Sequence, residues 1–227
     1  MTAFSLEANK KTDDAALWHW QPATWEKYCN YRDNPNNSRL RLFFDNDALL
    51  LLDMGWEGIE HAGFCDLFTM ILGFWFAQHP EQQFTSLGRC LLEKEPLKAG
   101  ASDLVLYLGE QFPVWEKGEK RRIDLNKWRV PNLVGEISDT TLTTDLDEKK
   151  RLYASLGIPE YWVIDVRGNR VFIFLLQGGG SYQPSGVSVA LGGLSVDLLN
   201  QTIEKMVQES NGNAALWFAQ QIVRISG

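Results

Sequence analysis

The chain has 227 residues, of which 44% are hydrophobic, with nine tryptophans, six tyrosines and twelve phenylalanines. This composition supplies enough apolar surface for a sizeable core in one domain of ordinary size, and it excludes wholesale disorder. The formal net charge of −7 argues against a simple nucleic-acid coat protein, which neutralises phosphates with an excess of lysine and arginine. It is compatible with an enzyme, because a metal site needs carboxylates.

The three cysteines are widely spaced and form no CxxC or Cys/His zinc pattern. We therefore expect free thiols in a reducing cytoplasm. The opening residues lack the apolar core of a signal peptide. The most apolar stretch, 64–77, is too short to span a bilayer and predicts a buried helix. The protein is thus expected to be cytoplasmic and to have no membrane partner.

The first half of the chain predicts a hairpin and a central helix. Residues 1–15 are polar and are expected to be loose, and Thr24 is positioned to cap a short helix. Two apolar runs around the turn Asp45-Asn46-Asp47 predict a β-hairpin, and an apolar stretch that ends at Pro80 predicts the helix. The expected elements are a helix at 24–32, strands at 39–44 and 48–53, a helix at 61–79, and short strands near 82–87, 89–93 and 103–108.

The second half opens with a long polar insertion at 109–130 that is locally positive. The sequence leaves open whether this insertion contacts phosphates or is a solvated loop. A strand, a helix closed by Gly157 and a second strand then form a β-α-β unit, whose strands should run parallel. The expected elements are strands at 132–138, 160–165 and 170–176, and helices at 145–156, 195–209 and 213–224. Their order is typical of a mixed α/β domain.

Two carboxylates interrupt apolar strands: Asp103 opens one, and Glu136 lies within another. A carboxylate in an apolar strand is costly to desolvate unless it is paired or binds a metal. The alternative for each is a position at a strand edge that faces water. Hydrolysis of a phosphodiester needs a divalent metal on carboxylate oxygens and a nearby lysine. The two acids are therefore candidate ligands of Mg²⁺ or Mn²⁺.

Two candidate lysines, Lys149 and Lys150, lie in the helix that follows the Glu136 strand. Asp145 and Lys149 are i,i+4 neighbours and form a favourable helix pair. Taken alone, this charged stretch is also typical of a solvated helix face.

The stretch 131–174 resembles the core of the putative restriction endonuclease family abundant in cyanobacteria, which belongs to the PD-(D/E)xK nuclease superfamily. That family's pattern runs P-D-L-V-x-E-V-x-S, then D-x-x-x-K-x-x-x-Y, then G-V-x-E-Y-W-x-V-D. Upstream, Asp103 resembles the first catalytic acid, and Glu60-His61 resembles an E-H element at the start of the first core helix. The resemblance covers roughly 39–184. The matching central positions are Pro131, Leu133, Val134, Glu136, Asp145, Lys149, Tyr153, Gly157, Glu160, Tyr161, Trp162 and Asp165.

The resemblance implies a restriction-endonuclease-like fold, in which helices flank a four-stranded mixed β-sheet core, here with an N-terminal β-hairpin extension. It implies that Asp103 and Glu136 bind Mg²⁺ or Mn²⁺. The superfamily's Glu-x-Lys lysine would fall at Ser138. The lysine is therefore expected on the following helix, at Lys149 with Lys150 as the alternative. Glu60 is expected to be an auxiliary acidic ligand.

We expect an N-terminal arm with a short helix at 1–38, a nuclease-like domain at 39–191 and a C-terminal helical extension at 192–227. The resemblance implies a metal-dependent endonuclease that hydrolyses DNA phosphodiester bonds. A homodimer is expected, since cleavage of both strands of a duplex needs two sites, and no small-molecule cofactor is expected. The alternative is a catalytically inactive module that keeps the nuclease fold for binding or assembly. Two departures from the family pattern motivate it, Asn132 in place of aspartate and Ser102 in place of proline.

Overall fold

The structure is a computed structural model that describes residues 19–37, 40–53, 58–120 and 122–226. The segment at 1–15 that is expected to be loose lies outside these residues. The described chain forms two six-stranded sheets and six α-helices. The helices are α1 (Trp25–Arg32), α2 (Ile59–Ala77), α3 (Leu142–Leu146), α4 (Glu148–Ser155), α5 (Val196–Gln208) and α6 (Asn211–Ser226), and a 3₁₀ turn, η2, spans Pro35–Asn37.

One sheet, here called the central sheet, contains the predicted β-α-β unit. Its parallel pair, β9 and β10, is confirmed, and all other neighbouring strands are antiparallel. The expected four-stranded mixed core is present as β7, β9, β10 and β11, and β4 and β12 extend it at its edges. In spatial order the strands are β12 (Tyr182–Ser185), β11 (Arg170–Leu176), β10 (Glu160–Asp165), β9 (Leu133–Ser138), β7 (Leu104–Leu108) and β4 (Phe84–Ser86).

The other sheet, here called the hairpin sheet, contains the predicted N-terminal hairpin, which is confirmed as β2–β3. Its turn needs a left-handed residue, and Asn46 supplies it with φ of 52°. The sequence pattern does not predict β6, because Lys-Ala-Gly-Ala lacks branched and aromatic residues. In spatial order the strands are β1 (Gln21–Pro22), β3 (Ala48–Asp53), β2 (Leu40–Asp45), β6 (Lys98–Ala101), β5 (Leu91–Lys94) and β8 (Ile123–Asp124).

Strand β6 needs its small residues because α4 packs closely on it. A Cβ atom on Gly100 would lie 3.0 Å from the ring of Tyr153. That separation is shorter than ordinary van der Waals contact, so glycine lets the helix approach the strand.

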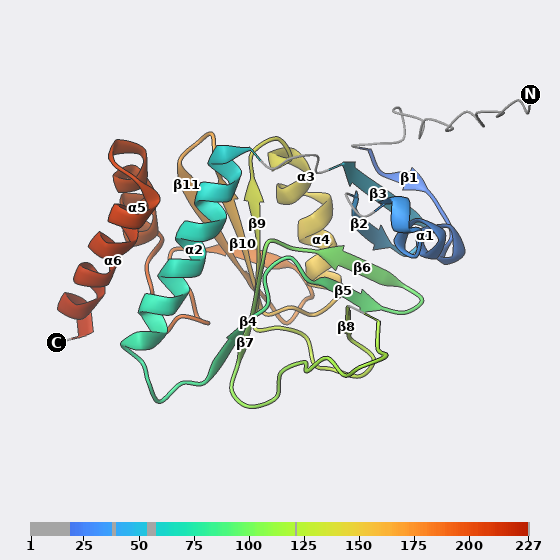
Figure 1. Ribbon diagram of the computed structural model, residues 1–227, viewed down its shortest axis with the longest axis horizontal. Coiled ribbons are helices and arrows are strands. Elements are labelled where there is room, and N and C mark those ends of the chain that lie inside the picture. Colours follow the sequence, from blue (N-terminus) through green and yellow to red (C-terminus); the bar gives the residue numbers. More distant parts are fainter. Residues whose placement is uncertain (1–18, 38–39, 54–57, 121, 227) are drawn as a thin grey trace, which may run out of the picture.

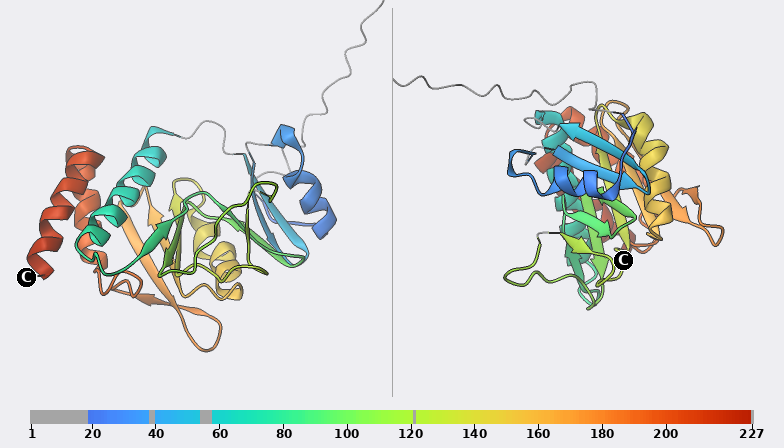
Figure 2. Two further views of the ribbon diagram at one scale, coloured as in Figure 1. Left: turned by 60° about the horizontal axis from the view of Figure 1, so that its bottom comes forward. Right: turned by 90° about the vertical axis from the view of Figure 1, so that its right-hand side faces the viewer.

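The two faces of the central sheet are covered by different layers (Figure 1). α2 and α5 pack on one face, over a core that includes Leu106, Ile137 and Trp162, and α6 packs against both helices. α4 and the hairpin sheet pack on the other, over a core that includes Phe43 and Tyr107. Figure 2 shows α1 and the hairpin sheet at the opposite end of the molecule from α5 and α6.

The long apolar helix predicted at 61–79 is confirmed as α2, which lies between the central sheet and α6. This position explains its apolar surface, since both sides are covered. Although α2 is strongly apolar, no helix in the described ranges combines the length and apolarity of a membrane span.

The single helix predicted at 145–156 is divided in two. Asp147 has φ of −121° and ψ of −85°, outside the helical region, and it separates α3 from α4. The break coincides with a contact to the central sheet, because the Tyr161 hydroxyl of β10 donates to the Asp145 carbonyl at 2.9 Å.

The other predicted helices are confirmed within a few residues of their ends, and Thr24 caps α1 by accepting from the Lys27 N–H at 3.2 Å.

Glu160 ties the loop after β12 to the central sheet. Its buried carboxylate accepts hydrogen bonds from Trp162 Nε1 and Ser188 Oγ, both at 2.6 Å. It also accepts from the backbone N–H groups of Val189 at 2.9 Å and Ala190 at 2.8 Å. A buried carboxylate with this many donors fixes the path of the loop.

We predict that Glu160→Ala lowers the free energy of unfolding by about 3 kcal/mol, because several buried donors lose their acceptor. Urea denaturation measures this change. Glu204→Ala, at an exposed position of α5, is the matched control and should change stability by less than about 0.5 kcal/mol. Equal effects of the two substitutions would contradict the prediction.

Candidate active site

Asp103 lies just before β7, and both of its carboxylate oxygens have partners. Oδ2 accepts a hydrogen bond from the backbone N–H of Ile137 in β9 at 2.8 Å, and Oδ1 lies 2.8 Å from Nη1 of Arg41 in β2. Burial alone would raise the pKa of Asp103. The Arg41 guanidinium and His61 outweigh burial and lower this pKa to about 2. Asp103 is therefore ionised at neutral pH.

Glu136 lies inside β9, on the strand next to Asp103. Its Oε1 accepts a hydrogen bond from the Tyr153 hydroxyl at 2.6 Å, and its Oε2 lies 3.1 Å from Nζ of Lys149. Burial raises the pKa of Glu136 to about 7, although Lys149 and Arg41 act in the opposite direction. An additional cation near this carboxylate would favour its ionised form.

Lys149 projects from the first turn of α4 toward Glu136. Its Nζ lies 2.7 Å from Oδ1 of Asp145 and 4.2 Å from the ring centroid of Phe43. Burial alone would lower the pKa of Lys149, but the Asp145 and Glu136 carboxylates raise it. The group is therefore an ammonium ion. Asp145 is itself held by the Thr141 hydroxyl, which donates to Oδ2 at 2.7 Å.

Two predicted site residues lie outside this cluster. Lys150 is one residue further along α4 and so points about 100° away, where its Nζ lies 4.3 Å from the ring centroid of Phe174. Glu60 is exposed in the first turn of α2. The structure thus brings Asp103, Glu136 and Lys149 together, and it gives neither Lys150 nor Glu60 a place beside them.

Arg41 is the residue of this cluster that sequence reasoning missed. The run Arg39–Phe44 predicts a strand, and the strand pattern alone gives Arg41 no role. A cation between apolar residues of a predicted strand is the signal that could have identified it, by the same logic that singled out the two acids. Besides Asp103, its guanidinium contacts the Ala101 carbonyl, and Nη2 lies 3.6 Å from Oε2 of Glu136.

A second set of possible metal ligands shares Asp103. His61, Cys65 and Asp103 are buried, and one ligand atom from each lies within 4.8 Å of the others. His61 Nε2 lies 3.6 Å from Oδ1 of Asp103, and it has no hydrogen-bond partner among the residues that the structure describes. Because it contains a thiol, this set suits a softer ion such as zinc better than magnesium.

The set formed by Asp103 and Glu136 fits a hard divalent cation. Carboxylate and carbonyl oxygens are the ligands that Mg²⁺ and Mn²⁺ prefer, and the Ala101 carbonyl lies beside the two acids. The Arg41 guanidinium already bridges these oxygens. The position therefore accommodates positive charge, with an arginine as the stand-in for an ion.

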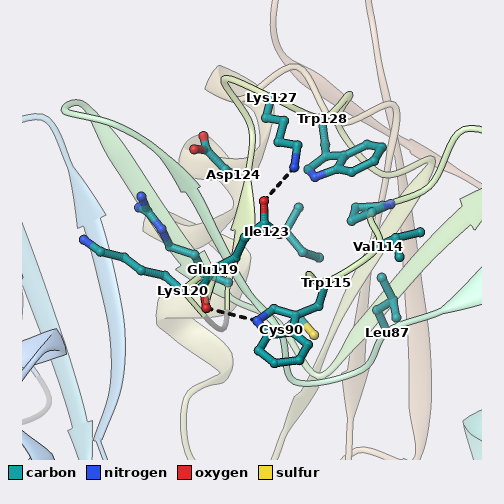
Figure 3. Close-up of a pocket in the computed structure, with 12 residues that line it drawn as sticks. Leu87, Cys90, Val114, Trp115, Glu119, Lys120, Ile123, Asp124, Lys127 and Trp128 are labelled. Atoms are coloured by element: carbon teal, nitrogen blue, oxygen red, sulfur yellow. Dashed lines mark hydrogen bonds and ion pairs between the residues drawn. The ribbon is translucent and has the colours of Figure 1, made fainter. Parts of the chain in front are cut away.

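The basic insertion forms one wall of a cavity of about 650 Å³ that is lined by Trp115, Trp128 and Cys90, among others (Figure 3). Several cations of the insertion already have partners. Lys127 pairs with Glu119 at 2.7 Å, Arg122 pairs with Glu93 and Glu95, and Arg129 donates to backbone carbonyls. These contacts fold the insertion onto the domain.

The mixed central sheet flanked by helices confirms the expected restriction-endonuclease-like core, and the N-terminal hairpin extends it. The chain belongs to the Uma2 family, whose model, described as a putative restriction endonuclease, matches residues 25–209. A solved structure described as a putative nuclease of DUF820 from Anabaena variabilis is similar in fold, with a TM-score of 0.55 and 15% sequence identity. The match covers 80% of this chain and 99% of that one. No curated protein matches the chain.

His61 gives the site a pH-dependent contribution to stability. Burial alone would lower its pKa, but the Asp103 carboxylate raises it from 6.5 to about 10. Protonation of His61 therefore favours the folded state. This contribution is fully present below pH 6.5 and is lost as the pH rises toward the folded-state value.

We predict that the stability advantage of the natural protein over His61→Gln shrinks by about 2 kcal/mol from pH ~6 to pH ~9. Urea denaturation of both proteins at each pH measures it. Because the two proteins share all other titratable groups, the difference in their stabilities isolates the contribution of His61. An advantage that stays constant over this range would contradict the prediction.

Proposed function

We propose that this chain is a metal-dependent endonuclease that hydrolyses DNA phosphodiester bonds. Its family and the fold of its solved neighbour support nuclease chemistry. The main support for the site is that Asp103, Glu136 and Lys149 converge from three elements, with the lysine nitrogen 3.1 Å from the Glu136 carboxylate. Burying these charged groups costs free energy, and a chemical role of the cluster would account for that cost.

In this proposal Asp103 and Glu136 hold Mg²⁺ or Mn²⁺. When bound, such a cation neutralises charge on the phosphate and lowers the pKa of a water molecule. Tyr153 fixes one oxygen of Glu136, and the Ile137 N–H fixes one oxygen of Asp103. Each acid therefore presents its other oxygen in a defined direction, which is the preorganisation that a metal site requires.

Lys149 stabilises negative charge in this proposal and does not act as a base. Asp145 and Glu136 keep its amine protonated, so it has no free electron pair with which to accept a proton from water. An ammonium ion held beside the reacting phosphate lowers the energy of the charge that develops there. Phe43 and Asp145 position it by contacts on two sides.

We further propose a homodimer, because cleavage of both strands of a duplex needs two sites.

The three cysteines are free thiols in the described structure, which supports the proposal that the enzyme acts in the cytoplasm, where thiols stay reduced.

The alternative is a catalytically inactive nuclease fold that serves binding or assembly. One observation favours it: the side chains of Asp103 and Glu136 are each only 1% exposed, with a guanidinium against both. Metal binding and plasmid cleavage separate the two candidate functions.

We predict that the purified protein cleaves plasmid DNA with Mg²⁺ or Mn²⁺. Asp103→Asn, Glu136→Gln and Lys149→Met should each lower the rate by about 100-fold or more, because each removes charge from the reaction centre. Gel electrophoresis of the plasmid measures the rates, and circular dichroism confirms that the variants fold.

Lys150→Met is the matched control, since it removes the same charge from the adjacent residue of α4. Its rate should stay within about threefold of the natural protein's. Undiminished cleavage by Asp103→Asn, or no cleavage by the natural protein, would count against the enzyme and for the inactive module.

We predict that the carboxylate set, and not the thiol set, holds the metal. Glu136→Gln should weaken Mn²⁺ binding by about tenfold or more, whereas Cys65→Ser should change it by less than about twofold. Isothermal titration calorimetry measures both. A larger loss with Cys65→Ser than with Glu136→Gln, accompanied by a preference for Zn²⁺, would assign the metal to His61, Cys65 and Asp103 instead.

A further inference from the structure

Arg41 lies at the position that the proposed function assigns to a metal ion. Its guanidinium is surrounded by three oxygens from two sheets: Asp103 Oδ1 at 2.8 Å, Glu136 Oε2 at 3.6 Å and the Ala101 carbonyl. A hard divalent cation prefers the same kinds of oxygen. An ion and this guanidinium would therefore compete for the same atoms.

Arg41 is better placed to leave the carboxylates than Lys149 is. Its side chain is 15% exposed, whereas those of Asp103, Glu136 and Lys149 are each 1% exposed. Arg41 thus lies between the carboxylates and solvent. Lys149 is enclosed by Asp145, Glu136 and the Phe43 ring, so it has no comparable route to water.

Charge counting points the same way. Beside the three carboxylates Asp103, Glu136 and Asp145, the cluster already holds the cations Arg41 and Lys149, and His61 lies against Asp103. A bound dication would therefore leave positive charge in excess, with or without a proton on His61. When Arg41 turns out to solvent, this excess falls by one charge. Buried charge is least costly when it is balanced.

We propose that Arg41 is an exchangeable counter-ion: it neutralises Asp103 and Glu136 in the metal-free protein and is displaced when a divalent metal binds. This inference rests on the proposed function, since it concerns the same metal site. Arg41 is thus a residue that sets metal affinity, and it acts through competition for the ligands and not by contact with the metal.

The test is Mn²⁺ titration of the full chain by isothermal calorimetry, together with the shift in melting temperature that saturating Mn²⁺ produces. Arg41→Gln should bind Mn²⁺ at least about tenfold more tightly than the natural protein, because the metal no longer displaces a cation. Its melting temperature without metal should fall, and Mn²⁺ should raise it by more than it raises that of the natural protein. Arg41→Lys, which keeps the charge, should remain closer to the natural affinity.

Arg32→Gln is the matched control. Arg32 also pairs with a buried carboxylate, Glu93, at 2.9 Å, and its side chain is 10% exposed. This variant loses the same charge and a comparable ion pair away from Asp103, so it should lose stability without tighter Mn²⁺ binding. Unchanged or weaker binding by Arg41→Gln would overturn the inference, as would an equal gain in Arg32→Gln.

A crystal structure of the natural protein with Mn²⁺ gives a measurement that does not depend on the folding of a variant. The inference expects the Arg41 guanidinium beyond hydrogen-bond distance of Asp103 when the metal is bound. A guanidinium still bonded to Asp103 beside the metal overturns it while the proposed function stands. If no protein of the series binds Mn²⁺, both the proposed metal dependence and the exchange fail.

Discussion

Balanced burial of charge is the constraint on which the rest of this structure depends. Asp103, Glu136 and Asp145 lie between two sheets, and an unpaired ion in such a place costs several kcal/mol. Their partners come from separate elements: Arg41 from the N-terminal hairpin, and Lys149 from the helix that crosses between the parallel strands. The hairpin sheet and α4 are therefore fixed on the central sheet by electrostatics as well as by the apolar core that they share.

The pairing of two strands of the central sheet places the two acids side by side. The antiparallel register of β7 with β9 places Leu104 opposite Gly135 and so brings Asp103 next to Glu136. A side chain at Gly135 would press on Leu104, with a Cβ atom only 3.1 Å from it. Glycine at this position leaves room for the Leu104 side chain on the face of β9 opposite to Glu136.

The sequence predicts much of this arrangement because its strongest patterns are local. The β-α-β unit, the N-terminal hairpin and α2 follow from apolar periodicity and turn residues, and the two acids are conspicuous in their strands. Arg41 is conspicuous in its apolar strand as the acids are in theirs, but its partners could not be predicted from local patterns. They are 62 and 95 positions away along the chain, and the pairing depends on how the sheets stack. The choice between Lys149 and Lys150 was open for a similar reason, since a turn of about 100° decides it. Strand β6 was missed because packing against α4, and not β propensity, selects its residues.

The break at Asp147 lies between Asp145 of α3 and Lys149 of α4, and these two side chains still pair across it. The Tyr161 hydroxyl donates a hydrogen bond to the Asp145 carbonyl, and the Thr141 hydroxyl donates one to the carboxylate of the same residue, which pairs with Lys149. The exposed ion pair of Asp147 and Arg151 faces water on the far side. Substitutions at Asp147 and Arg151 would therefore alter a solvated ion pair and leave the contacts of the Lys149 amine with Asp145 and Glu136 intact.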